Sequence, residues 1–73
     1  MIKGKVDNCV ISRGVVVEEG ARIKNCIVFT DSFIGKNVNL EYVLTDKGAQ
    51  VLATKELKGD SNNVVYIHQG AKL

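Results

Sequence analysis

The sequence predicts an all-β solenoid, and two observations support this fold class. The first is a 17-residue repeat in residues 6–51, where VDNCVISRGVVVEEGAR is followed by IKNCIVFTDSFIGKNVN and then by LEYVLTDKGAQV. The second is the alternation of apolar and polar residues in short segments such as residues 21–24. Such alternation is typical of strands, whose successive side chains point to opposite faces. We therefore expect three short strands in each coil, with neighbouring coils stacked about 4.8 Å apart by backbone hydrogen bonds.

Four columns of residues stay apolar from coil to coil, and we interpret them as the lining of the stack. They are Val6, Ile23 and Leu40; Val10, Ile27 and Leu44; Val17, Ile34 and Val51; and Ala21 and Val38. A coil of 17 residues is three hexapeptides less one residue, so one corner is shorter, and we place it near residues 13–14 and 30–31. Glycine and asparagine near the corners fit this arrangement, because they adopt left-handed backbone conformations at low cost.

The 73 residues suffice for one domain, and the pattern divides them into three parts. Residues 1–5 are a polar lead-in or linker, and residues 6–73 form the β-helix domain. Within it, ATKELKGDSNN at 53–63 is predicted to be an excursion loop. The pattern then returns in VVYIHQGAKL, with an inward set that covers the open end of the core: Val65, Ile67, Ala71 and Leu73. A solenoid needs neighbouring repeats and capped ends, so three coils and a partial fourth suggest a fragment.

Two columns of apolar residues are predicted to point outward. Ile11 and Val28 share one column, and Val16 and Phe33 share another, on adjacent coils. Full burial of such a side chain stabilises by about 1.5–3 kcal/mol, so leaving four exposed forgoes a substantial stabilisation. Contiguous exposed apolar surface is typical of docking sites, and we predict an interface formed by these four residues.

Composition restricts the function classes. The net charge of +2 comes from interspersed charges and does not favour nucleic-acid binding. No segment reaches the roughly 20 apolar residues of a membrane span, and the start is too short and polar for a signal peptide, so we expect a cytoplasmic location. Cys9 and Cys26, one coil apart, should be stacked neighbours. A disulfide between them is geometrically conceivable, although a reducing compartment favours two free thiols.

The repeats resemble a known family. The segments IGKNVN, VEEGAR and IHQGAKL look like the left-handed parallel β-helix of hexapeptide-repeat proteins. The order of segments in NCVISRGVVVEEGARIKNCIVFTDSFIGKNVNLEYVLTDKGAQV is similar to the carboxy-terminal domain of bacterial glucose-1-phosphate adenylyltransferases, especially the regulatory-type subunit of glycogen biosynthesis. The resemblance implies a non-catalytic assembly and regulatory domain. Its parent transfers adenylyl from ATP to glucose 1-phosphate, and its partners are an upstream catalytic domain and further subunits.

The resemblance also implies an effector site for sugar phosphates or phosphate. The family has a basic residue after Asp in the motif that resembles TDKGAQV, and here that residue is Lys47. Lysine is a common point-charge partner for phosphate, although a solvated turn lysine is the alternative. The family's second basic determinant, near the chain end, has no clear counterpart in VVYIHQGAKL.

The chain itself offers no set of catalytic or metal-binding residues. A hexapeptide acyltransferase needs a catalytic histidine in a cleft between subunits, and the single histidine, His68, falls on a predicted turn. Catalytic zinc is usually held by three protein ligands, which one histidine and two turn cysteines do not supply. A glycine-rich phosphate loop with carboxylates for magnesium is also missing from the sequence. We therefore expect the chain alone to be inactive and to hold no cofactor.

An alternative interpretation is a fragment of a hexapeptide-repeat acyltransferase or of another sugar-nucleotidyltransferase. A trimer with affinity for acetyl-CoA would favour the acyltransferase.

Overall fold

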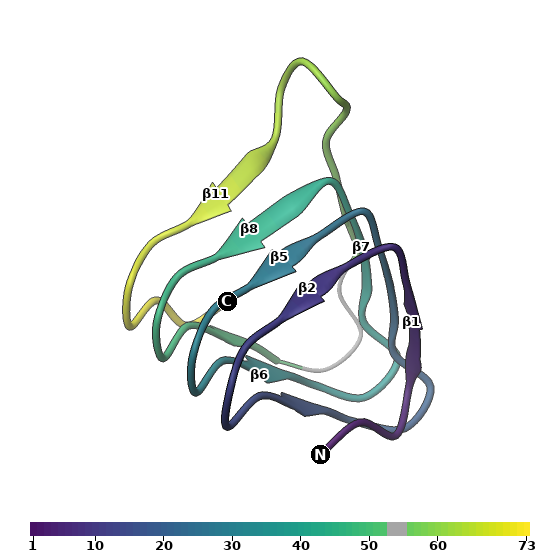
Figure 1. The fold of residues 1–73 in the computed structure, drawn as a ribbon, viewed down its shortest axis with the longest axis vertical. Helices are drawn as coiled ribbons and strands as arrows, with labels where there is room; N and C mark the ends of the chain where they lie inside the picture. Colours follow the sequence, from purple (N-terminus) through teal and green to yellow (C-terminus); the bar gives the residue numbers. More distant parts are fainter. Residues whose placement is uncertain (53–55) are drawn as a thin grey trace.

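The computed structural model describes residues 1–52 and 56–73, which form a stack of about three coils with a triangular cross-section. Each side of the triangle is a parallel sheet of strands only two or three residues long, and the described residues contain no helix. In Figure 1 the strands β2, β5, β8 and β11 lie side by side along one side of the prism. The sequence-based prediction of a parallel β-helix with hexapeptide repeats and 17-residue coils is confirmed.

Three sheets make the faces of the prism, and we name them faces 1, 2 and 3. Face 1 contains β1 (Lys5–Asp7), β4 (Arg22–Lys24), β7 (Asn39–Glu41) and β10 (Glu56–Lys58). Face 2 contains β2 (Val10–Ile11), β5 (Ile27–Val28), β8 (Val43–Thr45) and β11 (Val65–Ile67). Face 3 contains β3 (Val16–Val17), β6 (Phe33–Ile34) and β9 (Gln50–Val51).

The core is the apolar centre of the prism, which each strand supplies with one or two inward side chains. Its largest fully buried apolar members are Ile23, Ile34, Val17, Val28, Val38, Val43 and Val51. Two polar residues, Ser32 and Thr45, are also buried there. The Thr45 hydroxyl donates to Ser32 Oγ at 3.2 Å, and the Ser32 hydroxyl donates to the Asp46 carbonyl oxygen at 2.9 Å. Both hydroxyls are therefore satisfied, as burial requires.

The corner between faces 1 and 2 depends on a left-handed backbone conformation. Asn8, Asn25 and Tyr42 occupy equivalent positions there, with φ of 52°, 54° and 52°. Asparagine accepts this conformation readily, and the Asn8 amide also donates to the Asn25 side-chain oxygen. The corner between faces 2 and 3 uses Gly14, Gly48 and Gly70 in the same conformation, with Asp31 at the equivalent position of the second coil.

The prediction that Ile11 and Val28 point outward is wrong. After the left-handed residue Asn25, Cys26 turns inward and is only 2% exposed. Strand β5 therefore begins with an outward side chain, Ile27, followed by an inward one, Val28, which is fully buried. Ile11 likewise packs against the core. A shift of one residue exchanges the two faces of a strand, and both positions are apolar here, so the pattern did not reveal the shift.

The same shift applies to the column Val10, Ile27 and Leu44, which we interpreted as lining and which faces outward instead. The other three columns lie inside as predicted, with Val6 more exposed because it belongs to the end coil. Val16 and Phe33 do point outward, next to the buried Val17 and Ile34.

The two ends of the domain differ from the predicted boundaries. Residues 1–5 are not a separate linker, because Ile2 bridges Val17 in parallel and the terminal ammonium of Met1 donates to the Val15 carbonyl oxygen at 2.6 Å. Lys5 already belongs to β1.

The excursion loop predicted at 53–63 is also wrong in part. Residues 53–55 lie outside the described residues, but β10 pairs with β7 in face 1 and continues the coil. Among the described residues, the excursion comprises residues 59–64, where Asp60 and Asn63 form an isolated antiparallel bridge. The pattern then returns as predicted, because β11 pairs with β8. Ile67 and Ala71 are buried, Val65 is half-buried and Leu73 is exposed at the end of the stack.

Candidate functional site

Face 2 carries a stripe of apolar side chains on its outer surface. We call it the apolar stripe; it consists of Val10, Ile27, Leu44 and Tyr66, which are in register on the four strands of the face. Val10 is 61% exposed and Tyr66 59%, and Ile27 in the middle of the stripe is 39% exposed. Phe29, at the corner next to Ile27, is exposed as well. The apolar stripe therefore crosses every coil of the stack.

Face 3 has a smaller apolar area on its outer surface. The strand register places Val16 beside Phe33, and Gln50 follows in the third coil. Val16 and Phe33 are both half-buried. Of the four residues predicted to form an interface, these two are on the outside, whereas Ile11 and Val28 supply core packing.

The corner between faces 2 and 3 holds Lys47. Backbone hydrogen bonds from Asp31 to Arg13, from Gly48 to Thr30 and from Gly70 to Lys47 show which residues are equivalent in successive coils. One corner position is thus occupied in turn by Arg13, Thr30, Lys47 and Gln69, and we call this column the donor column. All four side chains carry hydrogen-bond donors, two of them cationic, and Lys47 is exposed to solvent.

A hydrogen-bonded pair lies beside Lys47. The Tyr66 hydroxyl donates to the Asp46 carboxylate, and the backbone N–H of Lys47 donates to the other carboxylate oxygen at 2.7 Å. The bond from Tyr66, with that from the Lys47 backbone, lowers the pKa of Asp46. The same bond raises the pKa of Tyr66, because removing its proton would place two negative groups together. Asp46 is therefore ionised at neutral pH and is already occupied by donors from this chain.

Cys9 and Cys26 are stacked in adjacent coils. The backbone N–H of Cys26 donates to Cys9 Sγ at 3.3 Å, which confirms that the two residues are neighbours in adjacent coils. Both cysteines are free in the structure. Burial raises the pKa of the Cys26 thiol, which makes it less reactive at neutral pH.

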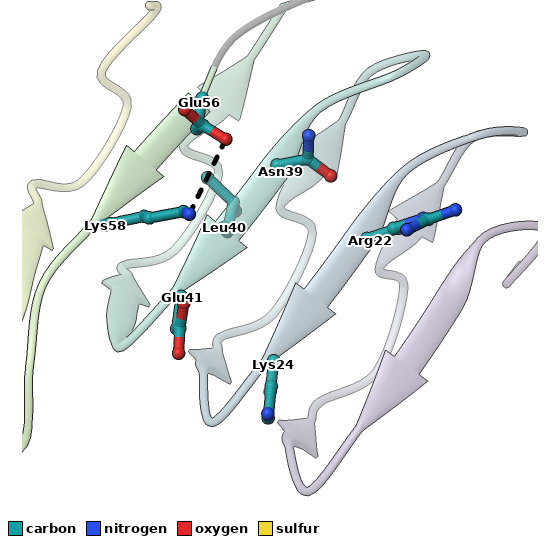
Figure 2. Close-up of a pocket in the computed structure, with 7 residues that line it drawn as sticks. All are labelled: Arg22, Lys24, Asn39, Leu40, Glu41, Glu56 and Lys58. Atoms are coloured by element: carbon teal, nitrogen blue, oxygen red, sulfur yellow. Dashed lines mark ion pairs between the residues drawn. The ribbon is translucent and has the colours of Figure 1, made fainter.

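Face 1 is charged, and it is hollowed along its centre. A groove of about 270 Å³ is lined by Arg22, Lys24, Asn39, Leu40, Glu41, Glu56 and Lys58 (Figure 2). In Figure 2, Lys24 and Glu41 extend on the same side of the sheet from the ends of neighbouring strands β4 and β7. Lys58 Nζ lies 3.8 Å from the Glu56 carboxylate, and both side chains are largely exposed. Sequence reasoning did not identify this groove, although the charges of the outward positions could be read from the 17-residue columns.

His68 lies exposed at the corner between faces 2 and 3, and its Nδ1 is 3.2 Å from the Gln69 carbonyl oxygen. Among the described residues, no three His, Cys, Asp or Glu side chains are grouped as metal ligands would be. The part of the chain that the structure describes also has no helix long and apolar enough to cross a membrane.

The fold and its faces define a hexapeptide-repeat β-helix module whose outer surfaces carry the apolar stripe, the donor column and the charged groove of face 1. The chain belongs to the family described as GlmU-like, C-terminal hexapeptide, whose model matches residues 1–68.

Two curated relatives share one printed name. A glucose-1-phosphate adenylyltransferase of Corynebacterium jeikeium is 40% identical over 50 residues, which are 68% of this chain and 12% of the relative. A glucose-1-phosphate adenylyltransferase of Bacillus cytotoxicus is 31% identical over 72 residues, which are 96% of this chain and 19% of the relative. The chain thus spans less than a fifth of the length of these relatives. No solved structure matches the chain significantly.

Proposed function

We propose that the chain is a non-catalytic assembly and regulatory module of a glucose-1-phosphate adenylyltransferase. The observation that carries the proposal is the similarity to two enzymes of that name, which in one case extends over 96% of the chain. In the parent reaction an oxygen of glucose 1-phosphate attacks the α-phosphorus of ATP, and the bond to the departing pyrophosphate breaks. The products are ADP-glucose and pyrophosphate, and ADP-glucose serves glycogen synthesis.

The apolar stripe supports the assembly role. We assign its occupant as the catalytic portion of the same adenylyltransferase, because the relatives have more than four-fifths of their length outside the matched region. An apolar surface that crosses all four strands of a face is more extended than the scattered exposed residues of a typical monomer. If the catalytic portion covered the apolar stripe, the burial of these side chains would stabilise the complex.

The test measures association and activity together. The purified chain is mixed with a purified glucose-1-phosphate adenylyltransferase catalytic portion from the same organism, and binding is followed by sedimentation velocity. We expect a 1:1 complex, ADP-glucose formation by the catalytic portion and none by the chain alone. Ile27→Lys should weaken binding by at least about tenfold, because it places a charge in the centre of the apolar stripe.

Two further variants make this test specific. Ser61→Lys adds the same charge in the turn outside the faces and should bind like the original chain. Phe33→Lys tests face 3 separately, so that loss of binding only with Phe33→Lys would move the docking surface there. The proposal fails if the unaltered chain does not bind, and binding of acetyl-CoA by a trimer would favour an acyltransferase instead.

The donor column supports a regulatory role for the same module. Lys47 would bind a phosphate group with help from Thr30 and Gln69, its neighbours in the column. Titration calorimetry with inorganic phosphate and with glucose 1-phosphate should detect binding, and Lys47→Ala should weaken it by about tenfold, the loss expected for one charged hydrogen bond. Lys36→Ala, another exposed corner lysine, is the matched control. Equal binding by both variants would remove Lys47 from the site.

A further inference from the structure

Face 1 presents two columns of outward side chains, in register across its four strands. The first column, from the first coil to the last, is Lys5, Arg22, Asn39 and Glu56. The second column, in the same order, is Asp7, Lys24, Glu41 and Lys58.

Pairing within one chain explains only the second column. Its charges alternate, so each strand carries the opposite charge to the next strand at this position, which favours the sheet modestly although no ion pair forms within the column among the described residues. In the first column, by contrast, Lys5 and Arg22 are like charges on adjacent strands, and the single acid, Glu56, lies at the far end. Among the described residues the only ion pair is the one between Glu56 and Lys58. Most of these charges are therefore available to a partner.

We propose that face 1 pairs with face 1 of a second copy of this chain, about a two-fold axis parallel to the strands. Such an axis sets each column opposite itself and reverses the order of the coils, because an isologous interface uses the same patch twice. In the second column, Asp7 then meets Lys58 and Lys24 meets Glu41. Every contact occurs twice.

The first column, which the single chain leaves unexplained, also becomes complementary. Its cation in the first coil, Lys5, meets the acid of the last coil, Glu56. Arg22 meets the neutral side chain of Asn39, whose amide oxygen can accept a hydrogen bond from the guanidinium. No like charges face one another in either column.

The other simple two-fold axis, along the stack of coils, does not fit. It would set each residue of one column opposite the residue of the other column on the same strand. Arg22 would then face Lys24 twice, and juxtaposed like charges oppose association. The charges therefore select the axis parallel to the strands.

The shape of face 1 agrees with this pairing. Asn39 and Glu41 are half-buried in the groove, whereas Arg22 and Lys24 are long and exposed (Figure 2). The two-fold axis brings the long cations of one copy onto the short, recessed acceptors of the other. The molecule extends over only 29 × 22 × 20 Å. The surface that one face can bury is therefore smaller than the area of about 800 Å² per partner that is buried in a typical stable complex. The dimer is accordingly weak, and because its contacts are charged it weakens with salt.

Face 1 shares no residue with the apolar stripe of face 2, so self-association and docking to a catalytic portion can be tested separately. Sedimentation equilibrium of the chain up to about 1 mM should show dimers at about 50 mM NaCl and at least about tenfold weaker association at about 500 mM. Lys24→Glu should abolish the dimer, because the introduced carboxylate would face Glu41 twice, and Glu41→Lys should do the same with two ammonium groups. Lys72→Glu, the same charge reversal at an exposed residue that bridges Gln50 of face 3, should dimerise as the original chain does.

Mixing the two single variants gives the decisive result. In a mixed pair both contacts are again between opposite charges, so the Lys24→Glu and Glu41→Lys chains should form a heterodimer although neither forms a homodimer. The double variant should dimerise with itself. Thermal unfolding checks that each variant keeps the fold. A salt-independent dimer, stronger dimerisation of Lys24→Glu, or no heterodimer on mixing would each overturn the proposal, as would a strictly monomeric chain at low salt.

Discussion

Replacing Val28 with alanine tests the side-chain directions on which the faces depend. Val28 is fully buried, so the substitution removes two carbon atoms from the core. Their transfer contributes about 1.6 kcal/mol at about 0.8 kcal/mol per carbon. With the cavity that remains, the free energy of unfolding should fall by about 2–3 kcal/mol. For a domain of 73 residues, each kcal/mol shifts the melting temperature by about 4–8 °C, so we expect a decrease of roughly 8–24 °C in circular-dichroism melts.

Val10→Ala is the matched control, since it makes the same chemical change on the same face of the prism. Val10 points outward and is 61% exposed, so its loss should cost less than about 0.5 kcal/mol. If instead Val10→Ala produced the large decrease in melting temperature and Val28→Ala the small one, the outward and inward positions of face 2 would be interchanged. The apolar stripe would then not exist.

Three further outcomes are expected. Gly48→Ala should lower the free energy of unfolding by about 1–2 kcal/mol in the same melts, because alanine is strained at the φ of 68° that Gly48 adopts. Nothing lies within 4 Å of the added methyl group, so a steric clash does not contribute. An unchanged melting temperature would mean that this corner is not left-handed. Tyr66→Phe removes the hydrogen bond to Asp46. The stability difference from the original chain should be largest between about pH 5 and pH 9. At lower pH the difference should shrink as Asp46, whose pKa is lowered, becomes protonated. At higher pH it should shrink as Tyr66, whose pKa is raised, ionises. A difference that did not depend on pH would contradict the hydrogen bond. Iodoacetamide at mildly alkaline pH should label Cys9 before Cys26, because Cys26 is buried and its pKa is raised; mass spectrometry of digested samples measures this, and equal labelling would contradict the burial.

The fold could be predicted because packing in the core restricts the residue types at the inward positions of every coil. Positions such as Ile23 and Leu40 must fill the same place in successive coils, so their apolar character recurs with the coil length and reveals it. The strand at Glu56–Lys58 was missed because its outward residues are charged and only Leu57 is apolar, which makes a three-residue strand look like a loop. Pairing with β7 determines its structure, and that contact between distant residues is not visible in local composition.

The direction of each side chain on face 2 could not be predicted for a different reason. Ile27 and Val28 are both apolar, so alternation gives no information about which one points inward. The preceding corner determines which residue points inward, because Asn25 is left-handed there and Cys26 is turned into the core. On face 1 the phase was clear from Arg22, Ile23 and Lys24, because polar and apolar residues alternate there.

The outer surface of a β-helix is under weaker constraint than its core, and this is why the faces can differ. The fold accepts almost any residue type at an outward strand position. A column of similar residues on the outside of the prism therefore needs a cause other than the fold. Face 2 repeats apolar residues such as Ile27, and face 1 carries charges such as Lys24 whose order is self-complementary. Because the two surfaces share no residue, Ile27→Lys and Lys24→Glu should each remove one kind of association and leave the other intact. Loss of both by either variant would mean that the two faces serve a single interface, and the assignment of separate partners would then fail.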